Sequence, residues 1–457
     1  MSFRMRSTRK ALAALLATGV GLLPATGASA TSSLGTSHTG PRVTITFWSA
    51  MSGTLGATLG HLVNQFNSSQ STYKVDLLYK GSYSTVLSAT IAAVRAHHAP
   101  DIAQIFDAGT ATMMYAPGVY VPVHQLMSQY HLKFATSQFI GGAASYYETA
   151  QGDLDSLPFN SSTPVLYYNR SLLAKAGIKA PPKTWTQLAN DVNPLASSGA
   201  KCVLSASGAY IMWTDMEQFD LWNGYPYATQ NNGYDSIKNV KLLLTAKPMV
   251  QHWAFLGNLG KRGLYRWNGT TNSTVPFFTN GTCAFYENSS ADINEIEAGA
   301  KFPVGITQLP YVGGNSTAPQ NTVVGGASLW VLSGAPKNTY LGDAEFLHFM
   351  MSVPTQDYWA SHTGYVPVTN AAANALHKKG FYKTHPSDLV AVLELTHKPP
   401  KPWTRGIRVG YLPEIRVAEA SAIAAILSGK TSASSALASA QAQGNKVLAE
   451  FASQYGG

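Results

Sequence analysis

The stretch Val-Thr-Ile-Thr-Phe-Trp at residues 43–48 alternates between apolar and polar side chains and predicts a β-strand. Two more strand-like segments follow at 73–79 and 101–106, and segments with helical apolar spacing at 55–66 and 83–97 separate the three strands. Strands that alternate with helices of this length favour a mainly parallel sheet with helices on both faces and right-handed crossovers. The predicted fold class is therefore α/β.

A second α/β region follows further along the chain. A strand is predicted at 164–169, and Thr184 with Gln187 three residues later has the pattern of a capping box that starts a helix. The strand predicted at 323–330 contains paired glycines, which suit a segment that crosses between two lobes. The Ala-rich, periodic stretch 415–453 predicts two closing helices.

The loops after the first three strands are candidate ligand contacts. In open α/β sheets, ligands bind beyond the carboxyl ends of the strands, which here are followed by residues 51–53, 81–83 and 107–110. The chain also contains 9 Trp, 23 Tyr and 17 Phe, several beside small polar residues. Sugar and polyol pockets use this mixture, because aromatic faces pack on C–H surfaces while hydroxyls hydrogen-bond. The alternative for any single aromatic residue is that it fills the core.

The first thirty residues have the organisation of a secretory signal peptide. Residues 1–10 carry four bases and no acid, residues 11–23 are largely apolar, and residues 24–30 end in Ala-Ser-Ala. The apolar run is shorter than the roughly 20 residues of a membrane-spanning helix, and no cysteine follows it to carry a lipid anchor. We expect residues 1–30 to be removed, residues 31–42 to form a flexible linker, and the product to be periplasmic or extracellular.

The net charge and the two cysteines limit which partners and metals the chain is expected to bind. The formal charge of +9 falls to +5 without the signal peptide, a diffuse excess that does not indicate nucleic-acid binding. Cys202 and Cys283 would face an oxidising compartment, where a pair tends to form a disulfide. Two small buried residues are the alternative, because pairing needs Cα atoms within about 7 Å. Two thiols with no supporting histidine cluster predict no metal site.

The sequence contains none of the major catalytic signatures. It has no phosphate-binding loop, no dinucleotide-binding glycine motif, no His-Glu-x-x-His and no Gly-x-Ser-x-Gly. Asp153 with Asp155, or Glu295 with Glu297, could be nominated as the two carboxylates of a glycosidase, but nothing distinguishes them from surface acids. We therefore expect no enzymatic activity and no cofactor.

Several segments, in order along the chain, resemble the glycerol-3-phosphate-binding proteins of ATP-driven ABC importers. They are Phe-Trp-Ser-Ala-Met-Ser-Gly at 47–53, Tyr-Lys-Gly-Ser-Tyr at 79–83, Gly-Thr-Ala-Thr-Met-Met at 109–114, Pro-Phe-Asn-Ser-Ser-Thr-Pro at 158–164, Pro-Lys-Thr-Trp at 182–185, Trp-Asn-Gly at 222–224, Pro-Gln-Asn at 319–321, Gly-Gly-Ala-Ser-Leu-Trp at 325–330, Thr-Gly-Tyr at 363–365 and Gly-Ile-Arg at 406–408. The resemblance covers essentially the whole chain from Val43.

The resemblance implies a periplasmic-binding-protein fold, with two α/β lobes that crossing segments join and that close around one ligand. The first lobe would comprise residues 43–156 with 328–368, and the second residues 157–327 with 369–457. It also implies a monomer that delivers its ligand to the transmembrane permease subunits of an ABC importer. Ligand that touches both lobes would favour the closed state by its differential affinity.

Five ligand contacts carry over directly from the family's motifs: Tyr83, Ser162, Gly326, Tyr365 and Arg408. Arg408 would offer a forked cation to a phosphate, while the hydroxyls and the Gly326 amide would supply neutral donors. Without the resemblance, a surface or interlobe salt bridge would be the preferred role of Arg408.

The remaining contacts depart from the family's pattern. Asp107 stands where relatives have Glu, so the carboxylate stays but is one methylene shorter. Tyr210, with Trp213 nearby, stands where an aromatic wall, commonly Trp, is expected. The expected serine falls at Ser273 or at Thr274, because the local spacing is one residue longer, and we assign Ser273.

The predicted ligand is sn-glycerol-3-phosphate or a glycerophosphodiester such as glycerophosphocholine. A binding protein for an uncharged sugar or oligosaccharide is the first alternative, and in that case Arg408 would be dispensable. A secreted hydrolase, with turnover and two indispensable carboxylates, is the second.

Overall fold

The computed structural model describes residues 41–270 and 274–456. The predicted signal peptide (1–30), most of the predicted linker (31–42) and Ser273 lie outside the described residues. Across the described ranges, no helix combines the length and the apolar character that crossing a membrane requires.

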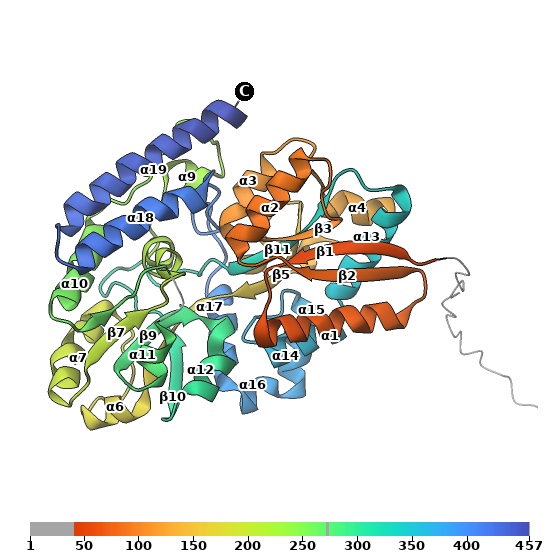
Figure 1. Cartoon of the computed structure of the whole chain (residues 1–457). Helices are drawn as coiled ribbons and strands as arrows, with labels where there is room; N and C mark the ends of the chain where they lie inside the picture. Colours follow the sequence, from red (N-terminus) through yellow and green to blue (C-terminus); the bar gives the residue numbers. More distant parts are fainter. Residues whose placement is uncertain (1–40, 271–273, 457) are drawn as a thin grey trace, which may run out of the picture. The chain divides into compact units, whose positions relative to one another are not determined.

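The first sheet has the strand order β2-β1-β3-β11-β4, with β5 also paired to β11 (Figure 1). Its strands are β1 (Val43–Ser49), β2 (Tyr73–Tyr79), β3 (Ile102–Phe106), β4 (Tyr120–Val121), β5 (Leu157–Ser162) and β11 (Gly325–Leu332). β1 runs parallel to β2 and β3, as the sequence predicts, but β11 is antiparallel to β3, β4 and β5. The sheet is therefore mixed rather than mainly parallel, because β11 enters it against the direction of the first three strands.

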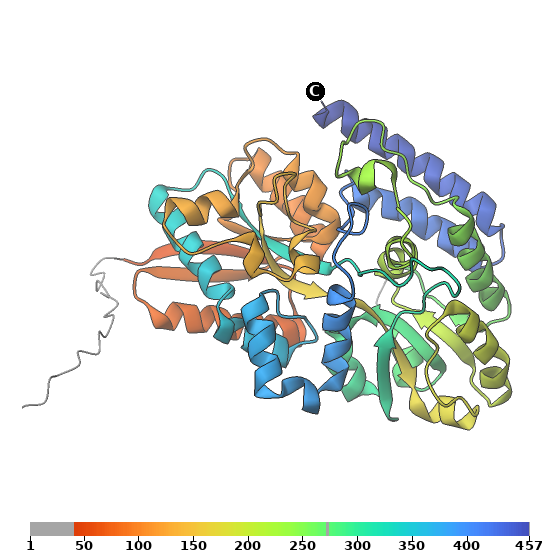
Figure 2. The same ribbon diagram turned by 180° about the vertical axis from the view of Figure 1, so that it is seen from behind.

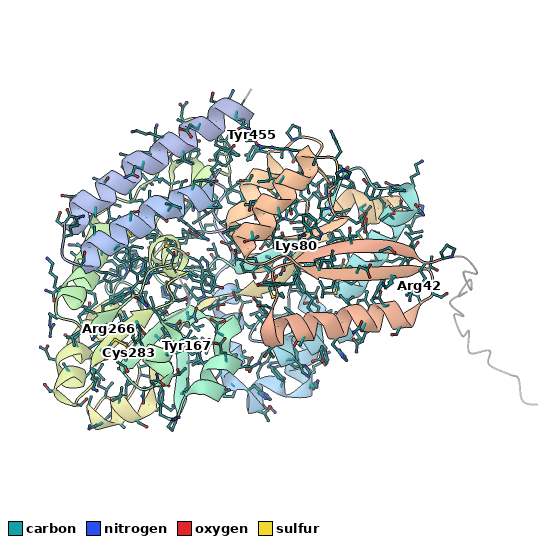
Figure 3. The ribbon with its side chains drawn as sticks, viewed as in Figure 1. Arg42, Lys80, Tyr167, Arg266, Cys283 and Tyr455 are labelled. Carbon is teal, nitrogen blue, oxygen red and sulfur yellow. A yellow bond between two sulfur atoms is a disulfide. The ribbon has the colours of Figure 1, made fainter. Side chains whose placement is uncertain are left out.

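The second sheet has the order β10-β6-β9-β7-β8. Its strands are β6 (Pro164–Asn169), β7 (Cys202–Ala206), β8 (Tyr265–Arg266), β9 (Cys283–Ser289) and β10 (Val304–Gln308). Cys202 and Cys283 lie opposite each other on the parallel strands β7 and β9, 4.3 Å apart at Cα, and form a disulfide (Cys283 is labelled in Figure 3). The pairing that the sequence leaves open is thus made between neighbouring strands.

Helices cover both faces of the first sheet. α1 (Gly53–Ser69) and α2 (Tyr83–Arg95) lie on opposite sides of it (Figures 1 and 2). The buried side chains of α1 include Leu59, Leu62 and Phe66, which the helical period of 3.6 residues places on one face. The other helices near this sheet are α3 (Thr110–Met114), α4 (Val123–Gln129), α5 (Gly141–Ala144), α13 (Lys337–Met350), α14 (Val353–His362), α15 (Asn370–Lys379) and α16 (Phe381–Thr384).

The remaining helices belong to the other half of the fold. They are α6 (Arg170–Lys175), α7 (Trp185–Ser197), α8 (Gln218–Trp222), α9 (Thr229–Gly233), α10 (Lys247–Lys261), α11 (Val275–Thr279), α12 (Ile293–Gly299), α17 (Pro386–Thr396), α18 (Leu412–Leu427) and α19 (Ala433–Tyr455). Thr184 caps α7, because its hydroxyl accepts a hydrogen bond from the amide of Gln187, as predicted. α18 and α19 are the two predicted closing helices, and they pack against each other and against α10.

The chain passes from the first sheet to the second between β5 and β6. β5 ends at Ser162 in the first sheet and β6 begins at Pro164 in the second. The predicted second lobe began at residue 157, whereas the ladder of β5 with β11 stays within the first sheet as far as Ser162. The lobe boundaries themselves stay a prediction.

Candidate functional site

A chain of buried hydrogen bonds leads from β1 to Tyr83. The hydroxyl of Ser49 and the amide of Ala50 both donate to Gln104 Oε1, at 2.8 Å. Gln104 Nε2 donates to Asn160 Oδ1, and Asn160 Nδ2 donates to the Tyr83 hydroxyl, each at 2.8 Å. Tyr83 is the first residue of α2, where its ring stacks on Phe106 with centroids 5.7 Å apart. This chain of hydrogen bonds fixes the position of Tyr83, because the side-chain amides of Gln104 and Asn160 each donate to one neighbour and accept from another.

Tyr365 adjoins Tyr83. Burial raises the pKa of Tyr365 to about 12, and hydrogen bonds with Tyr83 and Asn160 partly oppose that rise. Burial is also the main cause that raises the pKa of Tyr83, and the nearby phenols of Tyr365 and Tyr210 raise it further. The Tyr365 ring stacks on Trp359, with centroids 5.5 Å apart. The structure thus brings together the predicted site residues Tyr83, Tyr210 and Tyr365. Tyr83 and Tyr365 keep their protons at neutral pH and act as neutral hydrogen-bonding groups.

The paired glycines of β11 lie where two other segments approach closely. Gly326 has φ +101°, and a Cβ there would fall 1.8 Å from the carbonyl oxygen of Asn160. A Cβ on Gly325 would fall 2.6 Å from the ring of Trp213. Gly325 pairs with Ser162, which is buried at the end of β5. Both positions therefore require glycine, because neighbouring segments leave no room for a side chain. The same close packing places Ser162 and Trp213 beside the two glycines.

A π-helix at Trp213–Glu217 positions the aromatic wall. Tyr210 packs edge-on against Trp213, with ring centroids 6.4 Å apart, and these two rings form the wall that the sequence analysis nominated as a ligand contact. The same π-helix buries Glu217. Single π turns recur at functional sites because they change which residues face a pocket.

Arg408 is buried and held from three sides. Its Nη2 donates to the backbone oxygen of Tyr146 at 3.0 Å, and its guanidinium lies 4.1 Å from the ring centroid of Tyr234. Its amide donates to the backbone oxygen of Asn232. Its Nε has no hydrogen-bond partner among the residues that the structure describes. A buried guanidinium with a free donor and no carboxylate within salt-bridge distance, in this part of the chain, can bind an anion.

Asp107, the predicted contact to ligand hydroxyls, is engaged by a residue that the sequence analysis did not nominate. Its Oδ2 accepts from Arg416 Nη2 at 2.8 Å, and Arg416 also forms a two-bond contact with Glu217, at 2.7 and 2.8 Å. Burial raises the pKa of Asp107, and Arg416 opposes that rise. One carboxylate oxygen of Asp107 is thus held by a cation rather than free to contact a ligand.

Sequence reasoning missed several supporting residues: Gln104, Asn160, Glu217, Tyr234 and Arg416. Gln104 and Asn160 lie inside buried strands, and Arg416 has the spacing of an ordinary helix residue. Only Asn160 had a signal, because it falls within the Phe-Asn-Ser-Ser motif that carries Ser162.

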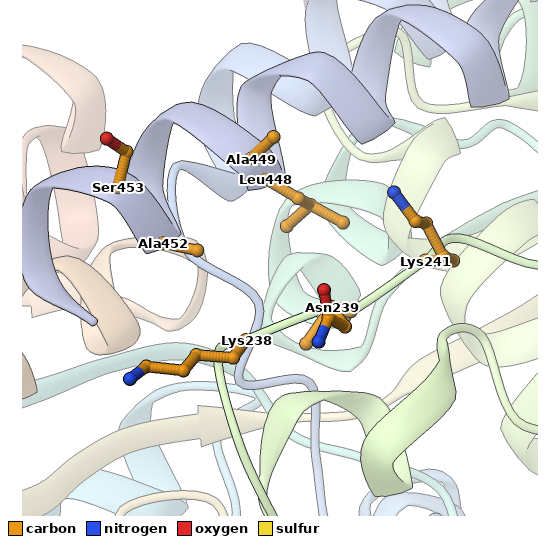
Figure 4. A pocket seen from close by; sticks show the side chains of 8 residues that line it. Lys238, Asn239, Lys241, Leu448, Ala449, Ala452 and Ser453 are labelled. Atoms are coloured by element: carbon orange, nitrogen blue, oxygen red, sulfur yellow. The ribbon is translucent and has the colours of Figure 1, made fainter. Parts of the chain in front are cut away.

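A separate hollow lies on the surface beside α19 (Figure 4). Its volume is about 340 Å³, and its lining includes Lys238, Lys241 and Leu448. Both lysines are exposed, and none of the predicted site residues lines it. This hollow is therefore not the candidate site, for which we take the residues around Tyr83 and Trp213 together with Arg408.

Comparison with known proteins places the chain in a family. The bacterial extracellular solute-binding protein family matches residues 61–387. The chain belongs to this family. The sn-glycerol-3-phosphate-binding periplasmic protein of Escherichia coli (strain K12) is 40% identical over 411 residues, which cover 89% of this chain and 93% of that protein.

Two solved structures are similar in fold. The glycerophosphocholine complex of UgpB from Mycobacterium tuberculosis matches with a TM-score of 0.75 and 21% identity, covering 91% of this chain and 99% of that one. The cyclic alpha-maltosyl-1,6-maltose binding protein from Arthrobacter globiformis matches with a TM-score of 0.71 and 21% identity, covering 89% and 99%. These likenesses establish the predicted two-lobed α/β solute-binding fold.

Proposed function

We propose that this chain is the extracytoplasmic substrate-binding protein of an ABC importer and that it captures sn-glycerol-3-phosphate or a glycerophosphodiester such as glycerophosphocholine. The buried guanidinium of Arg408, whose Nε has no hydrogen-bond partner among the described residues, carries this proposal. The relative from Escherichia coli, which is similar over most of the chain, is a sn-glycerol-3-phosphate-binding protein, and the similar structure from Mycobacterium tuberculosis contains glycerophosphocholine.

Each group has a defined task in this proposal. Arg408 binds the phosphate, and the backbone oxygen of Tyr146 with the ring of Tyr234 holds the guanidinium in place. Tyr83 and Tyr365 hydrogen-bond to phosphate or glycerol oxygens, and the aromatic wall at Trp213 limits the size of the head group. Because Tyr83 follows a strand of the first sheet and Trp213 follows a strand of the second, bound ligand favours the closed arrangement, which the permease recognises.

The rest of the proposal concerns export and turnover. Residues 1–30 direct export, the mature chain acts as a monomer outside the cytoplasm, and the ligand is delivered chemically unchanged. The periplasmic relative, the family of solute-binding proteins and the signal-peptide pattern of residues 1–30 support these statements.

Calorimetric titration of residues 31–457 with glycerol-3-phosphate, glycerophosphocholine and maltose tests the proposal. We expect saturable 1:1 binding of at least one phosphate compound and a loss of affinity of at least about 100-fold in Arg408→Ala, because a charged hydrogen-bonding partner is removed. Arg262→Ala is the control, since Arg262 is exposed and, among the described residues, its side chain hydrogen-bonds only to Asn193. Binding of maltose alone, or unchanged binding in Arg408→Ala, would contradict the proposal, and product formation would support the hydrolase alternative.

A further inference from the structure

Arg416 joins two buried acids that come from different parts of the fold. It lies near the start of α18 and faces the 3-10 turn Asp107–Gly109, which follows β3 of the first sheet. Its Nε and Nη2 bind Glu217 at 2.7 and 2.8 Å, and Nη2 also binds Asp107 at 2.8 Å. The Arg416 side chain is only 12% exposed, and those of Glu217 and Asp107 are 1% and 9% exposed. Water therefore screens these charges weakly.

This cluster adjoins the proposed phosphate contact. Tyr146 accepts the Arg408 hydrogen bond on its backbone oxygen. Burial raises the pKa of the Tyr146 phenol, and the next contributions come from Asp107 and Glu217, which raise it, while Arg416 lowers it. The backbone of Tyr146 thus contacts Arg408, while the phenol of Tyr146 interacts electrostatically with Asp107 and Glu217.

The charges in the cluster do not cancel. Two carboxylates face one guanidinium, so the cluster carries one net negative charge when all three groups are ionised. Without Arg416 the same place would hold two acids and no cation, beside the site that must accept a phosphate. Like charges at short range in a weakly screened site disfavour an anionic ligand.

We propose that Arg416 is a specificity-determining residue that allows the site to accept a dianionic phosphomonoester, by holding Asp107 and compensating the negative charge of Asp107 and Glu217. The inference rests on the proposed function. Glycerol-3-phosphate carries close to two negative charges at neutral pH, whereas the phosphodiester charge of glycerophosphocholine is balanced by its quaternary ammonium. The net charge of the cluster therefore affects the two ligands differently.

The test is the ratio of the two dissociation constants in the mature chain at pH 8. In Arg416→Gln we expect affinity for glycerol-3-phosphate to fall about tenfold more than affinity for glycerophosphocholine. The double variant Glu217→Gln with Arg416→Gln removes one acid and one cation, so it has the same net charge in the cluster as the natural chain. We expect it to recover most of the natural ratio even where absolute affinity is reduced.

Arg262→Gln is the matched control, because it removes one positive charge from an exposed site on the same half of the fold. We expect its ratio to equal that of the natural chain. Circular dichroism establishes that each variant is folded. If Arg416→Gln does not fold, the double variant is compared with Glu217→Gln alone. Glu217→Gln alone retains Arg416 and is one charge more positive than the double variant, so the ratio of dissociation constants in these two variants supplies the same comparison. Equal losses for both ligands, or an altered ratio that the double variant does not recover, would overturn the inference. Natural chain that binds neither compound would overturn the proposed function and this inference together, whereas normal binding with unchanged ratios would overturn the inference alone.

Discussion

The site has two halves that are built differently. Around Tyr83 and Tyr365, neutral amides and hydroxyls form a continuous chain of hydrogen bonds back to β1. Around Arg416, the contacts are between full charges, with Glu217 and Asp107 as the acids. Each neutral group can be satisfied by one neighbour, but a buried charge is stable only while its opposite charge stays in place.

The difference has consequences for how the two halves respond to change. Removing one hydroxyl from the neutral half leaves one donor or acceptor without a partner, a modest loss. Removing one member of the charged half breaks a buried ion pair and leaves charged hydrogen-bonding groups without their partners, which costs several times more. Three changes test this contrast, beginning with the largest expected effect.

The largest effect is expected for Glu217→Leu, which removes both hydrogen bonds to Arg416 from that side. We expect the free energy of unfolding to fall by about 3–5 kcal/mol, because the change breaks a buried two-bond ion pair and leaves Arg416 Nε without its acceptor, although Asp107 still pairs with Nη2. Urea denaturation measures it. Glu217→Gln keeps the shape and one acceptor and should lose less. A loss below about 1 kcal/mol in Glu217→Leu would remove the distinction between the two halves.

The charged half should also make stability depend on pH. Burial, and after it the charge of Glu217, raise the pKa of Glu419 to about 8, although its hydrogen bond from Tyr227 and the charge of Arg416 oppose the rise. The folded chain therefore holds this proton more tightly than the unfolded chain, in which the pKa is near 4.5. The contribution of Glu419 to stability is greatest below about pH 4.5, falls by roughly 1.4 kcal/mol per pH unit as pH rises towards 8, and then levels off.

Denaturation at several pH values between 5 and 8 checks this slope. Glu419→Gln, which cannot ionise, should have a shallower dependence over the same range than the natural chain. Glu394, which lies elsewhere and whose pKa burial also raises to about 8, provides a second slope that Glu419→Gln leaves in place. The neutral half supplies none, since the pKa of Tyr365 is about 12. Identical slopes in the natural chain and in Glu419→Gln would contradict the assignment.

The smallest effect is expected for Tyr83→Phe, in the neutral half. The change removes the acceptor for Asn160 Nδ2, so we expect the free energy of unfolding to fall by about 1 kcal/mol. Tyr130→Phe is the matched control, because the Tyr130 hydroxyl donates to the backbone oxygen of Lys337 near the surface. A loss in Tyr83→Phe as large as that in Glu217→Leu would show that the hydrogen-bond chain acts as one unit rather than as separate bonds.

The sequence predicted helices and strands correctly where the apolar residues follow a single helical or alternating periodicity. The three parallel strands, the cap at Thr184 and the two closing helices all follow from alternation, capping pattern and helical spacing. It did not predict that β11 runs antiparallel, because strand direction depends on how the chain returns from the other sheet and not on the composition of the strand. The same limit applies to β5, whose place in the first sheet is set by its pairing with β11.

Candidate site residues were found where a motif marks them. The structure brings Tyr83, Trp213, Gly326 and Tyr365 together, and Arg408 is buried with a free donor, while their contact with a ligand stays a prediction. Arg416 carries no such mark, because an arginine in an amphipathic helix is usually a solvated residue. Its role depends on Asp107, which lies 309 residues earlier in the chain.

The sequence by itself determined the α/β class and the family, because strand and helix periods and collinear motifs are properties of local order along the chain; the ligand contacts that it nominates stay a prediction. The tertiary structure alone decided the direction of β11, the disulfide between β7 and β9 and the cluster of Asp107, Glu217 and Arg416. Hydrogen bonds and ion pairs require atoms within about 3 Å of each other, and only folding brings residues hundreds of positions apart to that distance.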